Sequence, residues 1–290
     1  MDVFLPRTFE EALETAAAHP GVLPIAGGTD VMVELNMDLG RPETLMDVSR
    51  LPELLELRRE NGSVFVGAGV SYTRLMRELP EHTALVQASR SVGSPQIRNR
   101  GTIGGNLGTA SPAGDALPVL AAWDAEVILA RAGGSTRVVP WDAFLTGVKR
   151  NALEPGELIL GVRWDAPDGP GSFSKIGTRN AMVIAVASVC LQVGESSRSV
   201  RVALGSVAPT VVRARDAESI AAQSLQDAGA WDDPAADPAA DAIERFGEAV
   251  AGAANPIDDV RGTSAYRRHA VSVMARRALA WAIQDRRAAR

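Results

Sequence analysis

The stretch IAGGTD, residues Ile25 to Asp30, places two adjacent glycines between an apolar run and a carboxylate. A second stretch, TIGGN at Thr102 to Asn106, repeats the glycine pair after another apolar residue. Glycine adopts positive φ without strain and lets a backbone approach a phosphate with no Cβ in the way. Backbone amides that point into a concavity bind anions. One Gly-Gly pair is usually a turn, but two pairs from separate units of the fold predict two loops that embrace a diphosphate.

Single-loop nucleotide motifs do not fit the chain. The pattern GxxxxGK[ST] is absent, and GAGVSY at residues 67–72 has Tyr72 where GxGxxG requires its third glycine. We therefore interpret GAGVSY as an ordinary exit from a strand. Neither paired-glycine loop carries a lysine that would neutralise a γ-phosphate, which argues against ATP hydrolysis.

The composition limits the classes of protein to which the chain can belong. The chain has 290 residues with 46% hydrophobic content and no apolar run near the roughly 20 residues that span a bilayer, so we expect a soluble, two-domain protein. Its polar, acidic start lacks the pattern of a secretory signal, and we expect a cytoplasmic location.

Cysteine and histidine usage limits the possible metal chemistry. Cys190 lies in the apolar run AVASVCLQV, which predicts a buried, unreactive strand residue. One cysteine cannot hold an iron–sulfur cluster, which takes about four ligands, so any such cluster must lie on another chain. His19, His82 and His269 have no ligand neighbours at metal spacing, and we expect no structural zinc.

Charge is distributed unevenly around a formal net charge of −5. Residues 215–259 carry eleven Asp or Glu against two Arg, whereas residues 261–290 carry eight Arg against one Asp. A basic end is one mark of nucleic-acid binding. These arginines are interleaved with the amphipathic run VSVMARRALAWAI, which predicts a packed helix paired with the acidic segment or with a partner chain, and no nucleic acid.

The pattern along the chain is mixed α and β. Residues 8–21 predict a helix with Thr8 as its cap, and residues 22–26 and 44–49 predict strands. After them come strands at 63–71, 125–130, 136–140 and 157–164, and helices at 72–79, 82–92 and 113–123. The Pro/Gly-rich segment 165–171 predicts a domain boundary. Strands at 172–177, 185–193 and 199–207 and three helical segments from Ala214 onward then predict a small sheet covered by helices.

Five stretches follow one another over nearly the whole chain: LPIAGGTDVMVELN, RNRGTIGGNLGTASPAGDALPVLAAWDAEVIL, FSKIGTRNAMVIA, LGSVAPTVVRA and GTSAYRRHAVSVMARRAL. Together they resemble the FAD-binding medium subunit of the molybdenum hydroxylases, the family of xanthine dehydrogenase and carbon monoxide dehydrogenase. The two glycine motifs are distinctive in combination. The last two stretches resemble the flavoprotein C-terminal domain of that family.

This resemblance implies an α+β fold. It consists of a vanillyl-alcohol-oxidase-type (PCMH-type) FAD-binding domain over residues 1–170, made of two α/β subdomains at about 1–54 and 55–170, and a smaller α+β C-terminal domain over residues 171–290. The resemblance also implies a set of FAD contacts, carried over by position: Ile25, Ala26, Gly27, Gly28, Thr29, Asp30, Thr102, Ile103, Gly104, Gly105, Asn106, Asp115, Ile159 and Lys175. No catalytic acid, base or metal ligand is assigned.

The implied contacts have different roles in the family. The two glycine loops hold the diphosphate and the ribityl chain, and Asp115 matches an aspartate that also contacts FAD. Ile159 matches a position whose backbone lies beside the flavin. Lys175 matches a basic residue near the cofactor, and the alternative is that it forms a surface salt bridge.

The chain departs from the sequences of relatives in two segments. The first loop has AGGTD where carbon monoxide dehydrogenases typically have AGGHS, which favours the xanthine dehydrogenase side. Val183 stands where relatives often have an aspartate in KxxxRxxxxIA, although Lys175 and Arg179 still match. Any role borrowed for position 183 therefore does not carry over.

The resemblance implies an oxidoreductase subunit that transfers electrons. A molybdenum centre would hydroxylate a purine or another N-heterocycle, two [2Fe–2S] clusters would relay electrons, and FAD on this chain would pass them to NAD or another acceptor. An iron–sulfur small subunit and a molybdenum-cofactor large subunit would complete a dimer of heterotrimers. The alternatives are a flavin subunit of a carbon monoxide dehydrogenase-like or aldehyde-oxidising complex, a stand-alone flavin oxidoreductase of the same fold, and a non-enzymatic nucleotide-sensing module.

Overall fold

The computed structural model describes residues 2–289, and the contacts within the chain define two compact units. Unit 1 comprises residues 2–78, 94–111 and 124–166, and unit 2 comprises residues 79–93, 112–123 and 167–289. Two segments that precede the predicted boundary at 165–171 thus pack with the C-terminal part of the chain. The boundary near residue 170 stays a prediction about domains in the sequence.

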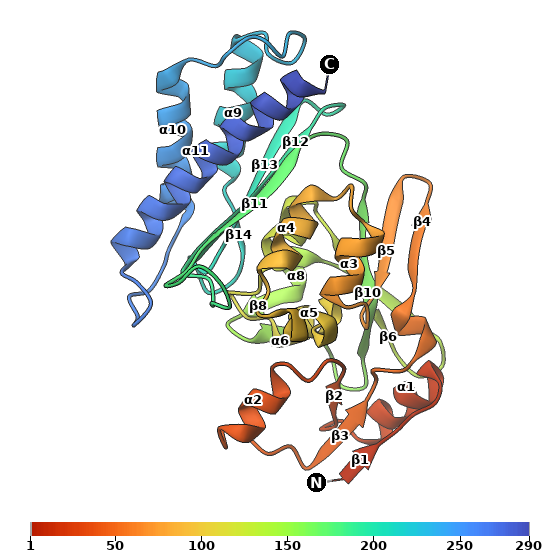
Figure 1. The fold of residues 1–290 in the computed structure, drawn as a ribbon. Coiled ribbons are helices and arrows are strands. Elements are labelled where there is room, and N and C mark those ends of the chain that lie inside the picture. Colours follow the sequence, from red (N-terminus) through yellow and green to blue (C-terminus); the bar gives the residue numbers. More distant parts are fainter. Residues whose placement is uncertain (1, 290) are drawn as a thin grey trace. The chain divides into compact units, whose positions relative to one another are not determined.

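Unit 1 begins with a small parallel sheet, in the order β1 (Asp2–Phe4), β3 (Thr44–Asp47), β2 (Leu23–Ile25) (Figure 1). Helix α1 (Phe9–Ala18) connects β1 to β2. The helix begins where the hydroxyl of Thr8 accepts a hydrogen bond from the N–H of Glu11 at 3.2 Å. Its apolar stripe, with Leu13 at the centre, packs in one core with Met46 of β3. The predicted helix at 8–21 and the strands on either side of the first loop are confirmed.

A second sheet in unit 1 is antiparallel, in the order β4 (Leu57–Glu60), β5 (Ser63–Gly67), β10 (Leu158–Asp165), β6 (Glu126–Ala130), β7 (Thr136–Pro140). The short elements of this unit are the 3-10 helix η1 (Pro52–Leu55), helices α2 (Val31–Asn36), α3 (Tyr72–Glu78), α5 (Pro95–Arg100), α6 (Ile103–Thr109) and α8 (Trp141–Phe144), and the strand pair β8 (Leu145–Gly147) and β9 (Arg150–Asn151). The sheet contains the four strands predicted for this region, together with β4.

Unit 2 is built on a four-stranded antiparallel sheet, in the order β11 (Gly171–Ile176), β12 (Ala187–Gly194), β13 (Ser199–Gly205), β14 (Val212–Arg213). Helices α9 (Arg215–Asp227), α10 (Ala240–Ala253) and α11 (Ser264–Ala288) are the three helical segments predicted after Ala214. Two shorter helices, α4 (Thr83–Ser91) and α7 (Leu117–Ala122), also pack on the sheet.

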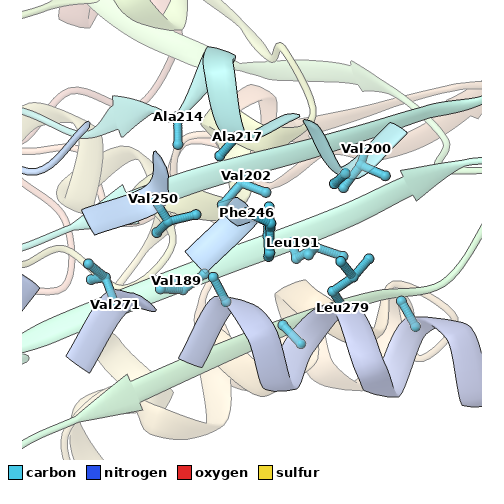
Figure 2. Close-up of a cluster of buried hydrophobic side chains, with 14 of the residues drawn as sticks. Val189, Leu191, Val200, Val202, Ala214, Ala217, Phe246, Val250, Val271 and Leu279 are labelled. Atoms are coloured by element: carbon cyan, nitrogen blue, oxygen red, sulfur yellow. The ribbon is translucent and has the colours of Figure 1, made fainter. Parts of the chain in front are cut away.

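Strand β12 is buried on both faces. Figure 2 shows Val189 and Leu191 within the apolar cluster formed with α9, α10 and α11. Successive side chains of a strand point to opposite faces, so Cys190 and Gln192 belong to the other face. There Gln192 Oε1 accepts a hydrogen bond from Trp123 Nε1, directly after α7, at 3.0 Å. The sheet is therefore a central layer of unit 2, which explains the continuous apolar run in the sequence.

The basic helix α11 pairs with the acidic segment that precedes it. Arg276 forms an ion pair with Glu244 at 2.5 Å, and Arg267 forms one with Asp259 at 2.6 Å. The prediction that the two charged segments pair is confirmed. No helix within residues 2–289 is both long and apolar enough to cross a membrane.

Candidate functional site

The first glycine segment leaves the carboxyl edge of the parallel sheet, where ligands commonly bind in open α/β sheets. Strand β2 ends at Ile25, and the chain turns through residues 26–30 into α2. Gly28 has φ +72°, and a Cβ at Gly27 would overlap the backbone carbonyl of Arg100. Both positions therefore require glycine, one for its conformation and the other for the close approach of another backbone segment.

Four successive backbone N–H groups of this segment, at residues 27–30, have no hydrogen-bond acceptor among residues 2–289. The segment is half-buried, except for the exposed Asp30, so solvent or a ligand reaches it. Consecutive amides in a turn with a positive-φ residue form an anion-binding concavity. The first segment thus has the donors that a phosphate group requires.

The second glycine segment is the first turn of α6 rather than a loop. Thr102 is the N-cap, and its hydroxyl accepts a hydrogen bond from the N–H of Gly105 at 2.9 Å. A Cβ at Gly104 would overlap Ala68, so this glycine lets the helix lie against the end of β5. The other N–H groups of the turn also donate within unit 1: Ile103 to Val70 O, Gly104 to Ala68 O and Asn106 to Thr102 O.

The expectation that both segments offer free backbone amides is therefore correct only for the first. In TIGGN the amides donate to the capping hydroxyl, to the preceding chain and to the helix itself. The second segment instead presents a nearly flat backbone surface, because Gly105 and Gly108 carry no side chains. A Cβ at Gly105 would meet only the Thr102 hydroxyl, at 3.1 Å.

The fold brings the two segments together although 77 residues separate them in sequence. Asp30 Oδ2 accepts a hydrogen bond from Thr109 Oγ1 at 2.8 Å, which ties the first segment to the end of α6. The backbone of Arg100, just before TIGGN, lies against Gly27. The sequence patterns do not predict these contacts, although Thr109 lies four residues after Gly105.

Ile159 lies beside α6. Its Cδ1 is 3.8 Å from the position that a Cβ on Gly108 would take. On the same helix, the side-chain carbonyl of Asn106 is buried without a hydrogen-bond donor among residues 2–289. Buried acceptors are nearly always hydrogen-bonded, so we expect a donor from outside the chain to reach this carbonyl. Ile159 and Asn106 thus both belong to the surroundings of the second segment.

Asp115 and Lys175 form an ion pair inside unit 2. Lys175 Nζ lies 2.6 Å from Asp115 Oδ2, and the two side chains are 9% and 6% exposed. Lys175 also donates to Ser91 O at 3.1 Å, and the hydroxyl of Ser91 donates to Asp115 Oδ2 at the same distance. The alternative that Lys175 forms a surface salt bridge is therefore wrong.

Burial dominates the electrostatics of this pair. It raises the pKa of the Asp115 carboxyl above its ordinary value, and the Lys175 ammonium opposes part of that rise. Asp115 Oδ1 has no donor among the described residues. As contacts of FAD, Asp115 and Lys175 stay predictions.

Cys190 is fully buried in β12, as predicted. Burial raises the pKa of its thiol, because an apolar environment disfavours the thiolate. No group of three or more His, Cys, Asp or Glu within residues 2–289 is arranged to hold a metal ion.

The chain matches known families over almost its whole length. Residues 1–164 match the family model described as the FAD binding domain in molybdopterin dehydrogenase. Residues 172–282 match the CO dehydrogenase flavoprotein C-terminal domain.

Individual relatives agree with these matches. The nicotinate dehydrogenase FAD-subunit of Eubacterium barkeri is 38% identical over 195 residues, which cover 64% of this chain and 66%, just under two thirds, of that subunit. The glyceraldehyde dehydrogenase medium chain of Sulfolobus acidocaldarius is 30% identical over 279 residues, which cover 94% of each chain. A solved structure of carbon monoxide dehydrogenase from Hydrogenophaga pseudoflava, which lacks the Mo-pyranopterin moiety, matches with a TM-score of 0.85 at 26% identity over 97% of this chain and 96% of that one.

The family matches and the relatives identify the chain as a flavoprotein subunit of the oxidoreductase class. The chain belongs to the family of FAD-binding proteins of the molybdopterin dehydrogenases, with the C-terminal domain of the CO dehydrogenase flavoproteins. The unpaired amides of residues 27–30 fit the diphosphate of FAD. When bound, FAD supplies the redox chemistry, while the protein binds and orients it.

Proposed function

We propose that this chain holds FAD through its first glycine segment. The observation that carries the proposal is the row of unpaired N–H groups at residues 27–30, beside a second segment whose own amides already donate within the chain. In this arrangement residues 27–30 bind the diphosphate. Asn106 and Ile159 lie along the surface on which the rest of the cofactor rests.

The bound cofactor would serve as the last electron carrier of a molybdenum hydroxylase. A separate iron–sulfur subunit delivers electrons to this chain, and NAD or another acceptor takes them. This division agrees with the single buried cysteine and with relatives named as FAD subunits and medium chains. A molybdenum-cofactor subunit, a dimer of heterotrimers and a cytoplasmic location complete the proposal.

The substrate class follows from the relatives rather than from this chain. Nicotinate is an N-heterocycle, and the similarity to a nicotinate dehydrogenase subunit supports oxidation of a purine or another N-heterocycle. The Thr29-Asp30 pair in the first segment favours the xanthine dehydrogenase side. The aldehyde-oxidising alternative is supported by the glyceraldehyde dehydrogenase medium chain, whose match covers more of both chains.

A flavin-selectivity titration tests the binding mode. The purified chain is stripped of cofactor and titrated with FAD, FMN and riboflavin, with flavin absorbance as the readout. Recognition through the diphosphate predicts that FAD binds most tightly and riboflavin most weakly. Equal affinity for FAD and riboflavin would contradict the proposed role of residues 27–30.

A substitution in the glycine segment provides the second arm. Gly27→Val introduces a side chain against the backbone of Arg100 and should abolish FAD uptake. Gly40→Val is the matched control, because a Cβ at Gly40 meets nothing within 4 Å. If Gly27→Val folds and keeps full FAD, the proposed role of residues 27–30 in FAD binding is wrong.

Isolation of the intact complex identifies the substrate and the electron acceptor together. The complex is assayed with purines, nicotinate and aldehydes as substrates and with NAD and a dye as acceptors.

A further inference from the structure

The short hairpin β8–β9 contacts the end of α6 through its backbone and one side chain. The N–H of Lys149 donates to Ala110 O at 3.1 Å, and Asn151 Nδ2 donates to Gly108 O at 2.8 Å. The last carbonyls of a helix have no partner within the helix. The hairpin therefore satisfies two of these groups on α6 and is fixed to that helix.

The same hairpin reaches α2 through the side chain of Lys149. Its Nζ lies 2.7 Å from Oε1 of Glu34, the fourth residue of α2. Lys149 has φ +52°, in the region that non-glycine residues seldom adopt. One residue thus bonds to α6 through its backbone and to α2 through its ammonium group.

Helix α2 depends on such contacts because its own side chains are not buried in a hydrophobic core. It is six residues long, and none of them is buried. It directly follows the four unpaired N–H groups, so displacement of α2 displaces the first glycine segment. Segments with few buried apolar contacts open locally at low free-energy cost.

We propose that Lys149 and Glu34 are positioning residues for FAD. Their ion pair holds α2 to the hairpin, and the hairpin is fixed to α6, so the pair keeps the first glycine segment in place beside the second. The Asp30–Thr109 hydrogen bond makes a parallel tie at the start of α2. Loss of the ion pair lets α2 open more often and releases FAD faster, while the fold of unit 1 stays intact.

This inference rests on the proposed role of residues 27–30 in FAD binding, and a double-mutant cycle tests it. Lys149→Met, Glu34→Gln and the double variant are loaded with FAD and diluted, and release is followed by flavin fluorescence. The pair is half-exposed, and exposed ion pairs contribute little, so each single variant should release FAD about two- to fivefold faster. The double variant should release it no faster than either single variant.

Two further variants separate positioning from a general effect of surface charge. The charge swap Glu34→Lys with Lys149→Glu should restore slow release, which loss of structure would not allow. Arg41→Met is the matched control, because Arg41 pairs with Asp38 at 2.8 Å just after α2 on a more exposed surface. It should release FAD at the wild-type rate. High salt should shrink the difference between wild type and Lys149→Met, because salt weakens ion pairs between solvent-exposed side chains.

The outcomes also distinguish this inference from the proposed function. If the wild-type chain takes up no FAD, the proposed function fails. If the wild type binds FAD but Lys149→Met and Glu34→Gln release it at the wild-type rate, only the positioning role is overturned. Additive effects in the double variant, no recovery in the charge swap, or equal acceleration by Arg41→Met would overturn it as well.

Discussion

Replacement of Lys175 by methionine should destabilise the chain strongly and in a pH-dependent way. The ammonium group lies 2.6 Å from Asp115 Oδ2, and both side chains are nearly inaccessible to solvent. Methionine has a similar length, so packing is largely kept while the positive charge is lost. Asp115 would then keep only the hydroxyl of Ser91, at 3.1 Å, as a hydrogen-bond donor.

The size of the loss follows from the burial of the remaining carboxylate. Removal of one partner of a buried ion pair typically costs about 3–5 kcal/mol, because the other charge stays desolvated and unpaired. Asn in place of Asp115 removes that charge. The double variant Asp115→Asn with Lys175→Met should therefore recover much of the free energy of unfolding that Lys175→Met alone loses.

The sign of the pH dependence follows from the pKa of Asp115. Burial raises it in the folded chain, and loss of Lys175, whose charge lowers it, raises it further. The folded chain then binds more protons than the unfolded chain between the unfolded value, about 3.9, and the folded value. Stability is retained below the unfolded value and lost as pH rises through the folded one. The deficit of Lys175→Met should be larger near pH 8 than near pH 5.

Urea unfolding followed by tryptophan fluorescence measures these differences, with wild type, Lys175→Met and the double variant compared at both pH values. A deficit of less than about 1 kcal/mol near pH 8 would place the pair among weak surface ion pairs. An equal deficit at both pH values, or no recovery in the double variant, would refute the buried-charge explanation.

Three further substitutions and one chemical modification have defined outcomes. Gly104→Ala should lower the melting temperature by forcing a Cβ into Ala68, although alanine favours helices by about 1 kcal/mol; Gly252→Ala, in open space on α10, should raise it slightly. Two neighbouring arginines lower the pKa of Glu78 to about 2, so its contribution to stability is present above about 4.5 and is lost as pH falls through about 2; Glu78→Gln should be less stable than wild type at neutral pH and equal to it in strong acid by urea unfolding. Cys190 should react with a thiol reagent only after unfolding, because it is fully buried.

Patterns with a local physical cause were predictable from the sequence. The helix cap at Thr8 lies where a hydroxyl and Glu11 predict it, and the apolar run around Cys190 forms the buried central strand. The Asn61-Gly62 hairpin between β4 and β5 was missed, although Asn-Gly is a strong hairpin signal. Both residues adopt positive φ, as such a turn requires.

The ion pairs between residues far apart in the sequence could not be predicted from local sequence patterns. The Lys175–Asp115 ion pair joins a strand after the predicted boundary to a segment before it, and the Lys149–Glu34 pair spans 115 positions. Helical and strand periodicities describe which face of an element is apolar. They do not specify which distant segment a charged side chain meets, because that depends on the packing of the complete unit.

The two Gly-Gly pairs look alike in sequence but differ in the hydrogen bonds of their backbone amides. In both pairs one glycine allows another part of the chain to approach closely: the backbone of Arg100 at Gly27, and the backbone and Cβ of Ala68 at Gly104. The difference arises at the hydrogen bonds. Thr102 stands three residues before Gly105 and caps a helix, so the amide of Gly105 donates to its hydroxyl and not to a ligand. Asp30 follows Gly28 instead and bonds to α6 through its side chain, and the amides of residues 27–30 have no acceptor among residues 2–289. Because the amides of TIGGN already donate within unit 1, we expect only the first pair to bind a phosphate through its backbone.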